Sequence, residues 1–197
     1  QHITAISRIA EEEYVWMDRF TIRNLELYHS TAANAVTLLE VIDKTISPMG
    51  GRLLKRWLAL PLKNSEKIKK RHEVVGFLLD HPEVLYKIQE QIKEMSDLER
   101  LISKVATGKV SPREVIQLKN SLEAIIPVKE TALGCDNEAL KVIGDNLHAC
   151  ELLRSKITES INEEAPVLIQ KGNVIARGFH KELDELRDIA FSGKDYL

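Results

Sequence analysis

The sequence predicts a mainly α-helical protein, with a multi-helical core and a small β patch formed by short strands near the two ends. Apolar residues recur at intervals of three or four over long stretches, which places them on one face of a helix. Serine followed by proline marks a helix start at two places. Two short stretches are instead rich in β-forming residues. We therefore expect a helical core over residues 1–165, and over 166–197 a short β hairpin followed by a helix.

The first half of the chain contains a helix start with an unusual feature. Ser47 and Pro48 have the N-cap and first-turn pattern, and Gly50 and Gly51 follow directly. Glycine in a helix costs roughly 1 kcal/mol relative to alanine, so the pair indicates a neighbour that packs closely or a sharp turn, since both favour a residue without a Cβ. In this half we expect helices at about 33–43, 48–59 and 65–80.

The second half begins with a long apolar stripe over residues 85–105. Ser96 and Glu99 have the spacing of a capping box, so the stripe is predicted to be two helices with a break near Ser96. Ser111 starts the next helix, with proline first and glutamate third, and Pro127 follows its apolar stripe. Further helices are expected at about 137–144, 147–162 and 181–192.

Two stretches break the helical pattern. Residues 14–18 are rich in β-forming side chains, and residues 167–178 have the composition of two short strands around a Gly172-Asn173 turn. If the two stretches pair with each other, they form the small β patch near the ends of the chain.

Composition excludes several classes of protein. With 44% hydrophobic and 29% charged residues and a net charge of −2, the chain is neither disordered nor globally attracted to nucleic acid. No apolar run approaches the ~20 residues of a membrane span. The chain has no signal-peptide pattern and does not begin with methionine, so we interpret it as a fragment. Its two cysteines, Cys135 and Cys150, could form one disulfide, but a single pair makes no disulfide framework and fits a reducing cytosol equally well.

The sequence contains no complete catalytic motif. It lacks a phosphate-binding loop, a nucleophile elbow and a His-Glu-x-x-His site. Cys135, His148 and Cys150 lie near one another in sequence, but there is no CxxC pair and no fourth ligand close by, which argues against zinc. We therefore expect no catalytic residue, no bound cofactor and no metal within this chain.

One stretch is locally basic. Residues 52–71 carry eight cations against the single acid Glu66, and Lys55, Lys69 and Lys70 are candidates for weak phosphate contacts. Trp57 is the one aromatic residue there that could stack on bases. The alternative is a charged surface that is solvated or paired with acids of another domain.

Several long blocks, in the same order, resemble the MutS family of DNA mismatch-repair ATPases. They are FTIRNLELYHS (20–30), LLEVIDKTISPMGGRLLKRWLALPLKN (38–64), SDLERLISKVATGKVSPREVIQLKNSL (96–122) and KGNVIARGFHKELDELRDIA (171–190).

The resemblance implies that the chain is the helical core, or lever, domain, and that residues 166–197 contain the root of the family's long helix to the clamp. The ATP site, the mismatch-reading Phe-x-Glu motif and the clamp itself are expected elsewhere in a longer protein. In the family this domain joins the ATPase to the clamp, so that nucleotide state and DNA state bias one another. For the full-length protein it implies ATP and Mg²⁺, mismatched double-stranded DNA, contacts with its own ATPase, connector and clamp domains, a homodimer, a MutL-type partner and a cytoplasmic location.

Within this domain we expect structural rather than catalytic roles. Arg52 is expected to pair with a carboxylate such as Asp43 or Asp97, and Trp57 is expected to be a core anchor on the face of Leu53 and Leu54. The candidate structural or interdomain residues are Arg23, Asn24, Gly50, Arg52, Trp57, Asp97 and Arg100.

Three functions remain open on the sequence alone. A coupling domain predicts no catalysis and little DNA affinity in isolation. An independent helical DNA-binding or protein-interaction module predicts salt-dependent binding of DNA. A metal-dependent enzyme predicts bound zinc.

Overall fold

The computed structural model describes residues 12–30, 32 and 34–194, and it confirms the mainly α-helical fold class. The elements are α1 Arg19–Asn24, α2 Leu38–Ile42, α3 Pro48–Ala59, α4 Ser65–Asp80, α5 Pro82–Glu94, α6 Leu98–Ala106, α7 Pro112–Glu123, α8 Ile125–Gly134, α9 Glu138–Asp145, α10 Glu151–Ser160, the 3₁₀ turn η1 Ile169–Lys171 and α11 Lys181–Lys194. None of the described helices is long and apolar enough to span a membrane.

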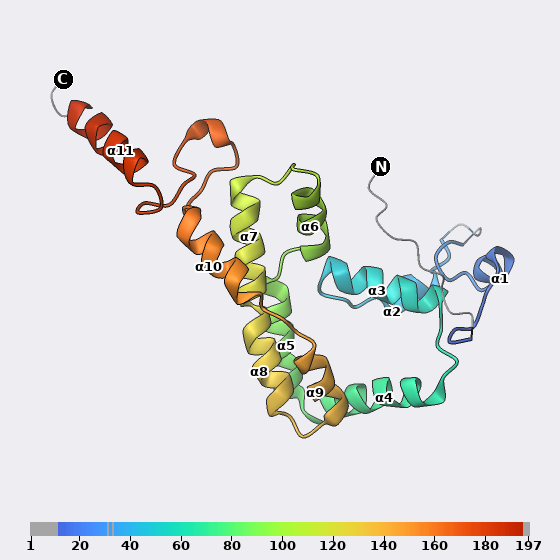
Figure 1. Ribbon diagram of the computed structural model, residues 1–197. Coiled ribbons are helices and arrows are strands. Elements are labelled where there is room, and N and C mark those ends of the chain that lie inside the picture. The colour runs from blue at the N-terminus through green and yellow to red at the C-terminus, as the bar shows by residue number, and fades with distance from the viewer. Residues whose placement is uncertain (1–11, 31, 33, 195–197) are drawn as a thin grey trace.

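The helices form a bundle with two extensions (Figure 1). Helices α5 to α10 make the bundle, in which α5 packs on α8, α7 on α10 and α8 on α9. Helix α4 leads into it from a separate group made by α1, α2 and α3, and α11 projects away at the other end (Figure 1). The arrangement is therefore open.

Two apolar clusters hold the bundle together. The first joins α6, α7 and α8 through buried residues, and the second joins α8 and α9, with partly buried side chains of α4 and α5 packed against it. Burying apolar surface is the main favourable term in folding. The buried members of the two clusters are Leu101, Leu118, Leu122 and Ile125, and Ala132, Cys135 and Leu140.

Polar groups on α7 reinforce these clusters. The fully buried hydroxyl of Ser121 accepts a hydrogen bond from the Ser96 amide (2.9 Å) at the corner between α5 and α6, and donates one to the Gln117 carbonyl (2.8 Å). Lys119 is also buried, and its ammonium lies 3.8 Å from Glu123 and 3.7 Å from Glu163, beyond α10. The contacts of Ser121 with Ser96 and of Lys119 with Glu163 tie α7 to segments distant in sequence.

The start of α7 has the predicted capping box. Ser111 and Glu114 bond reciprocally to each other's backbone N–H, and Glu114 also forms an ion pair with Lys104 of α6. The Lys104 ammonium, helped by the Ser111 amide, lowers the pKa of Glu114 to about 2. This corner between α6 and α7 is thus held by charge as well as by packing.

The adjacent glycines of α3 lie against the chain's own preceding loop. A Cβ at Gly50 would stand 3.1 Å from the Ser47 hydroxyl and 3.4 Å from the Cβ of Thr45, and one at Gly51 would stand 3.2 Å from the Thr45 hydroxyl. The Ser47 hydroxyl caps the helix by accepting from the Gly50 amide (3.1 Å). The close approach predicted from the sequence is therefore confirmed, and the neighbour is the loop that starts the helix.

Most predicted helices are confirmed, but two of them begin later than expected. The helix expected over 33–43 is α2, which begins after Thr37 because Thr37 and Glu40 form a capping box; residue 33 lies outside the described residues. The helix expected over 147–162 begins only at Glu151, because Cys150 has a left-handed backbone with φ of 47°. Helices α1 and α8 were not predicted. The break near Ser96 is confirmed, although Asp97 supplies the cap by accepting from the Arg100 amide.

The predicted β patch is not confirmed. The described residues contain two isolated antiparallel bridges, Tyr14 with Leu62 and Ile161 with Ile175, and no sheet joins the two ends. The hairpin expected over 167–178 does not form, although Gly172 and Asn173 both have positive φ as a tight turn requires. The turn instead returns the chain to the end of α10, where the backbone groups find their hydrogen-bond partners.

Candidate functional site

Arg52 of α3 reaches the first turn of α6. Its two terminal guanidinium nitrogens donate to both carboxylate oxygens of Asp97 (2.9 and 2.6 Å), and its Nε donates to Glu99 (2.6 Å). Such a planar two-pronged pair is among the stronger polar contacts between side chains. Arg52 therefore joins the α1–α3 group to the bundle.

Of the two carboxylates predicted to pair with Arg52, the partner is Asp97, the N-cap residue of α6. The predicted pairing with Asp97 is confirmed, whereas Asp43 accepts hydrogen bonds from the amide and hydroxyl of Thr45. The Arg52 guanidinium lowers the pKa of Asp97, and Asp97, then Glu99, raises the pKa of Arg52. Each group thus stabilises the charged form of the other.

Trp57 makes the second connection from α3, toward α4. The Arg71 guanidinium carbon lies 3.6 Å from the centre of the indole ring, which is a cation–π contact. The prediction that Trp57 is a core anchor is wrong, because the residue is 41% exposed and Leu53 is 47% exposed. The apolar face of α3 finds little to cover it among the described residues.

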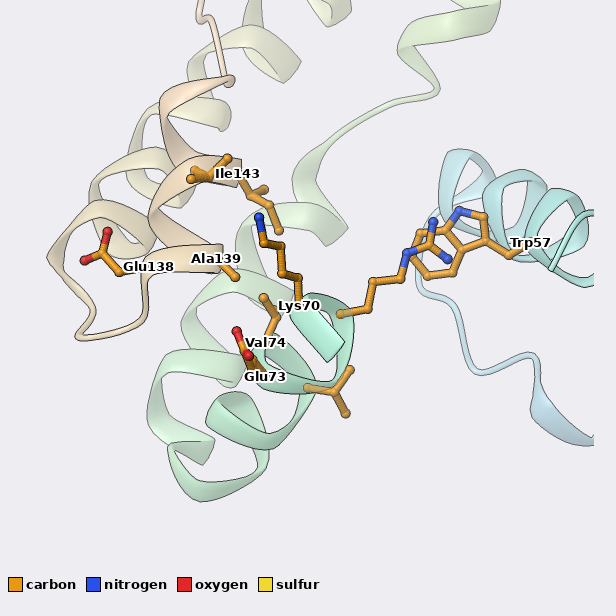
Figure 2. A pocket seen from close by; sticks show the side chains of 10 residues that line it. Trp57, Lys70, Glu73, Val74, Glu138, Ala139 and Ile143 are labelled. Carbon is orange, nitrogen blue, oxygen red and sulfur yellow. The ribbon is translucent and has the colours of Figure 1, made fainter. Parts of the chain in front are cut away.

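Trp57 also borders an apolar cleft of about 380 Å³ between α4 and α9. Figure 2 shows Trp57 on one side, Ala139 and Ile143 of α9 on the other, and Lys70 of α4 between them. Val75 and Val142, which also line it, are both more than half exposed. The lining also contains two basic and two acidic side chains, those of Lys70, Arg71, Glu73 and Glu138.

The basic stretch over residues 52–71 is partly neutralised within the chain. Lys69 pairs with Glu66 (3.3 Å) and Lys67 pairs with Glu13 (2.6 Å), while Arg52 and Arg71 are engaged as described. Lys55 and Lys70 form no ion pair with a carboxylate in the described part of the chain. Of the three candidate phosphate contacts, Lys69 is thus paired within its own helix, while Lys55 and Lys70 lie on different helices.

The remaining predicted residues lie apart from these contacts. Arg23 and Asn24 are exposed at the end of α1, where neither side chain forms a hydrogen bond or ion pair with another described residue. Arg100 is exposed one turn into α6, and its amide completes the cap made by Asp97. The structure therefore brings together Arg52 and Asp97, and it does not join Arg23 or Asn24 to them.

The root of α11 contains a compact polar network. Asp184 accepts from the Gly178 amide (2.7 Å) and from Arg187 (3.0 Å), and Arg187 also donates to the Ile175 carbonyl (2.9 Å). The pKa of Asp184 is lowered, first by the Gly178 amide and then by Arg187. A second pair, Arg177 with Asp188, lies further out and is exposed. These contacts fold the preceding turn onto the helix.

Comparison with known proteins identifies the domain. The family model described as MutS domain III matches residues 20–191, which is most of the chain. This chain belongs to the MutS domain III family. Its sequence-based resemblance to MutS is therefore confirmed.

Similar proteins named DNA mismatch repair protein MutS contain this domain as one part of a longer chain. The protein from Christiangramia forsetii is 79% identical and that from Flavobacterium psychrophilum 70% identical over all 197 residues. The protein from Parabacteroides distasonis is 51% identical over 196 residues. The chain spans about 23% of the length of the first two relatives and 22% of the third.

The contacts described above for this MutS domain III join its helices to one another. Within the described residues, no group of three or more His, Cys, Asp or Glu side chains is arranged to hold a metal ion. The sequence did not lead us to expect the contact of Glu99 with Arg52, the contact of Arg71 with Trp57, or the ion pair of Asp184 with Arg187. The i, i+3 spacing of Asp184 and Arg187 was a usable signal for an ion pair on one helix.

Proposed function

We propose that this domain is the lever of a DNA mismatch repair protein and mechanically couples its ATPase domain to its DNA-binding clamp. The observation that carries the proposal is α11, which is rooted in a packed bundle and then projects away from it (Figure 1). A helix keeps its direction while its hydrogen-bond ladder is intact, so it can carry a displacement over about 1.5 Å per residue.

The domain boundaries and site roles belong to the same proposal. Residues 1–165 form the lever core and residues 166–197 lead to the clamp, while Gly50, Arg52, Trp57 and Asp97 hold α3 in place or face another domain. We propose that the full-length protein binds ATP with Mg²⁺ and mismatched double-stranded DNA. We also propose that it forms a homodimer, interacts with a MutL-type partner and is located in the cytoplasm. The names of the relatives support the link to mismatch repair.

The coupling can be tested by bending α11 in the full-length protein. Leu186→Pro removes one backbone hydrogen bond and clashes with the preceding turn, so it kinks the helix near its root. Basal ATP hydrolysis should persist, while ATP-triggered release of DNA, measured by stopped flow, should slow. Leu186→Ala is the matched control, because Leu186 is 58% exposed and its truncation leaves the helix straight. An unchanged release rate in a folded proline variant would refute coupling through α11.

An independent DNA-binding module is the second candidate, and it is favoured by Lys55 and Lys70, which form no ion pair with a described carboxylate. The lever proposal expects the isolated chain to show no ATP hydrolysis and only weak, sequence-blind DNA binding that falls steeply with salt. Fluorescence anisotropy with matched and mismatched duplexes would measure this. Micromolar or tighter affinity at physiological salt would favour the module instead.

A further inference from the structure

The direction of α11 is decided where the helix leaves the bundle. The helix has 14 residues, or roughly 21 Å of length, and it extends outward from the end of α10 (Figure 1). A small tilt at its root therefore becomes a large displacement at its tip. The contacts at the root therefore determine whether α11 moves as one body with the bundle.

The turn that precedes α11 is itself fastened to the bundle. Ile175 forms the antiparallel bridge with Ile161, the Asn162 amide donates to the Val174 carbonyl (2.8 Å) and the Ala176 amide donates to the Ser160 carbonyl (2.9 Å). These bonds attach residues 174–176 to the end of α10, which packs on α7. The turn is thus a fixed extension of the bundle.

Arg187 and Asp184 connect this fixed turn to the helix on two sides. Arg187 uses one nitrogen for Asp184 and the other for the Ile175 carbonyl, while the second oxygen of Asp184 takes the Gly178 amide. Gly178 has φ of +87°, so the chain turns sharply between the two contacts. A straight helix joined by a single covalent link could swivel, and these added contacts remove that freedom.

The two side chains are also shielded. Their exposed fractions are 22% for Arg187 and 20% for Asp184, against 68% and 67% for the outer pair Arg177 and Asp188. Exposed pairs contribute little because water and salt screen them, whereas a shielded pair with backbone partners is held more firmly. The inner pair is therefore the one able to set the helix direction, and the outer pair offers a matched control.

We propose that Asp184 and Arg187 are positioning residues that clasp α11 to the turn at residues 175–178 and fix the direction of the helix relative to the bundle. This inference rests on the proposed function, because a fixed direction matters only if α11 transmits displacement. Neither residue touches DNA or nucleotide in this role. They act by preventing the lever from pivoting at its root.

Pulsed electron paramagnetic resonance on the full-length protein tests the clasp directly. Spin labels would be placed on the exposed Cys150 and on Ala190→Cys in α11, with other reactive cysteines removed. Arg187→Met keeps the apolar stem but removes both hydrogen bonds. Ala190 lies roughly 14 Å along the helix from Lys181, so about 20° of added tilt should broaden the distance distribution by about 5 Å. Arg177→Met should leave the distribution unchanged.

The same variants should be compared in ATP-triggered DNA release, which we expect Arg187→Met to slow by roughly fivefold to tenfold. Asp184→Asn, which keeps an acceptor for the Gly178 amide, should give a smaller effect in both measurements. Circular dichroism must show a cooperative melt for each variant. If Arg187→Met does not fold, Asp184→Asn replaces it as the test of the clasp in both measurements.

The two measurements separate the clasp from the proposed function. A distance distribution as narrow in the folded clasp variants as in the wild type would overturn the clasp, whatever the release rate. A broadened distribution with an unchanged release rate would support the clasp and overturn the lever proposal.

Discussion

The fully buried hydroxyl of Ser121 provides the sharpest test of how the bundle is held. Ser121→Ala removes the acceptor for the Ser96 amide at the corner between α5 and α6, from a position where Ser121 itself has no solvent exposure. Leaving a buried donor unpaired costs about 1–3 kcal/mol. The lost bond to the Gln117 carbonyl adds little, because that carbonyl also serves the helix. We therefore expect a loss of about 2 kcal/mol in the free energy of unfolding.

Urea titration and thermal melts followed by circular dichroism would measure this loss. For a chain of this size, 2 kcal/mol corresponds to a decrease in Tm of about 4–8 °C. Ser103→Ala is the matched control, since the Ser103 hydroxyl also bonds a carbonyl of its own helix but is exposed, and it should change stability by less than about 0.5 kcal/mol. Equal effects of the two variants would refute the role of the buried acceptor.

Three further predictions follow from contacts in α3, α4 and α7. Gly76→Ala should stabilise the chain by about 0.5–1 kcal/mol in urea titration, because its Cβ meets nothing within 4 Å, whereas Gly50→Ala should not, because its Cβ crowds the helix cap. Trp57 and Arg71 should show a coupling of about 0.5–1 kcal/mol in a double-mutant cycle, and a coupling near zero would remove the cation–π contact as a stabilising interaction. The pKa of Glu114 is lowered to about 2, so its ionised form stabilises the fold above its usual pKa, and this stabilisation should be lost as the pH falls from about 4.5 to 2. In acid melts, Glu114→Gln should abolish this part of the pH dependence.

Helices with local start signals could be predicted from the sequence. Ser47 and Ser111 cap α3 and α7 as expected, because a cap involves residues only three apart. Helix α8 has no side-chain cap and carries Pro127 in its first turn, where the missing N–H has no helical partner to lose. The same proline suggested the end of a helix, so α8 was missed.

The contacts between distant segments were less predictable. Arg52 and Asp97 could be paired by charge, but helical spacing shows only that Trp57 shares a face with Leu53, and not whether this chain supplies the surface that covers it. Likewise, spacing could suggest the ion pair of Asp184 with Arg187, while the bond to Ile175 depends on how the turn folds back. Such contacts are set by tertiary structure.

The two carboxylates around Lys119 have a consequence for the order in which the chain is made. Glu123 lies one helical turn away, so it is present as soon as α7 has been synthesised, whereas Glu163 leaves the ribosome only after α10. A buried ammonium without a partner is costly. In the nascent chain, Glu123 can hold the charge of Lys119 until α10 docks and Glu163 arrives. The helix therefore carries a counter-ion of its own, which stays beside Lys119 in the finished fold, and the bundle can begin to close before its last helix has been translated.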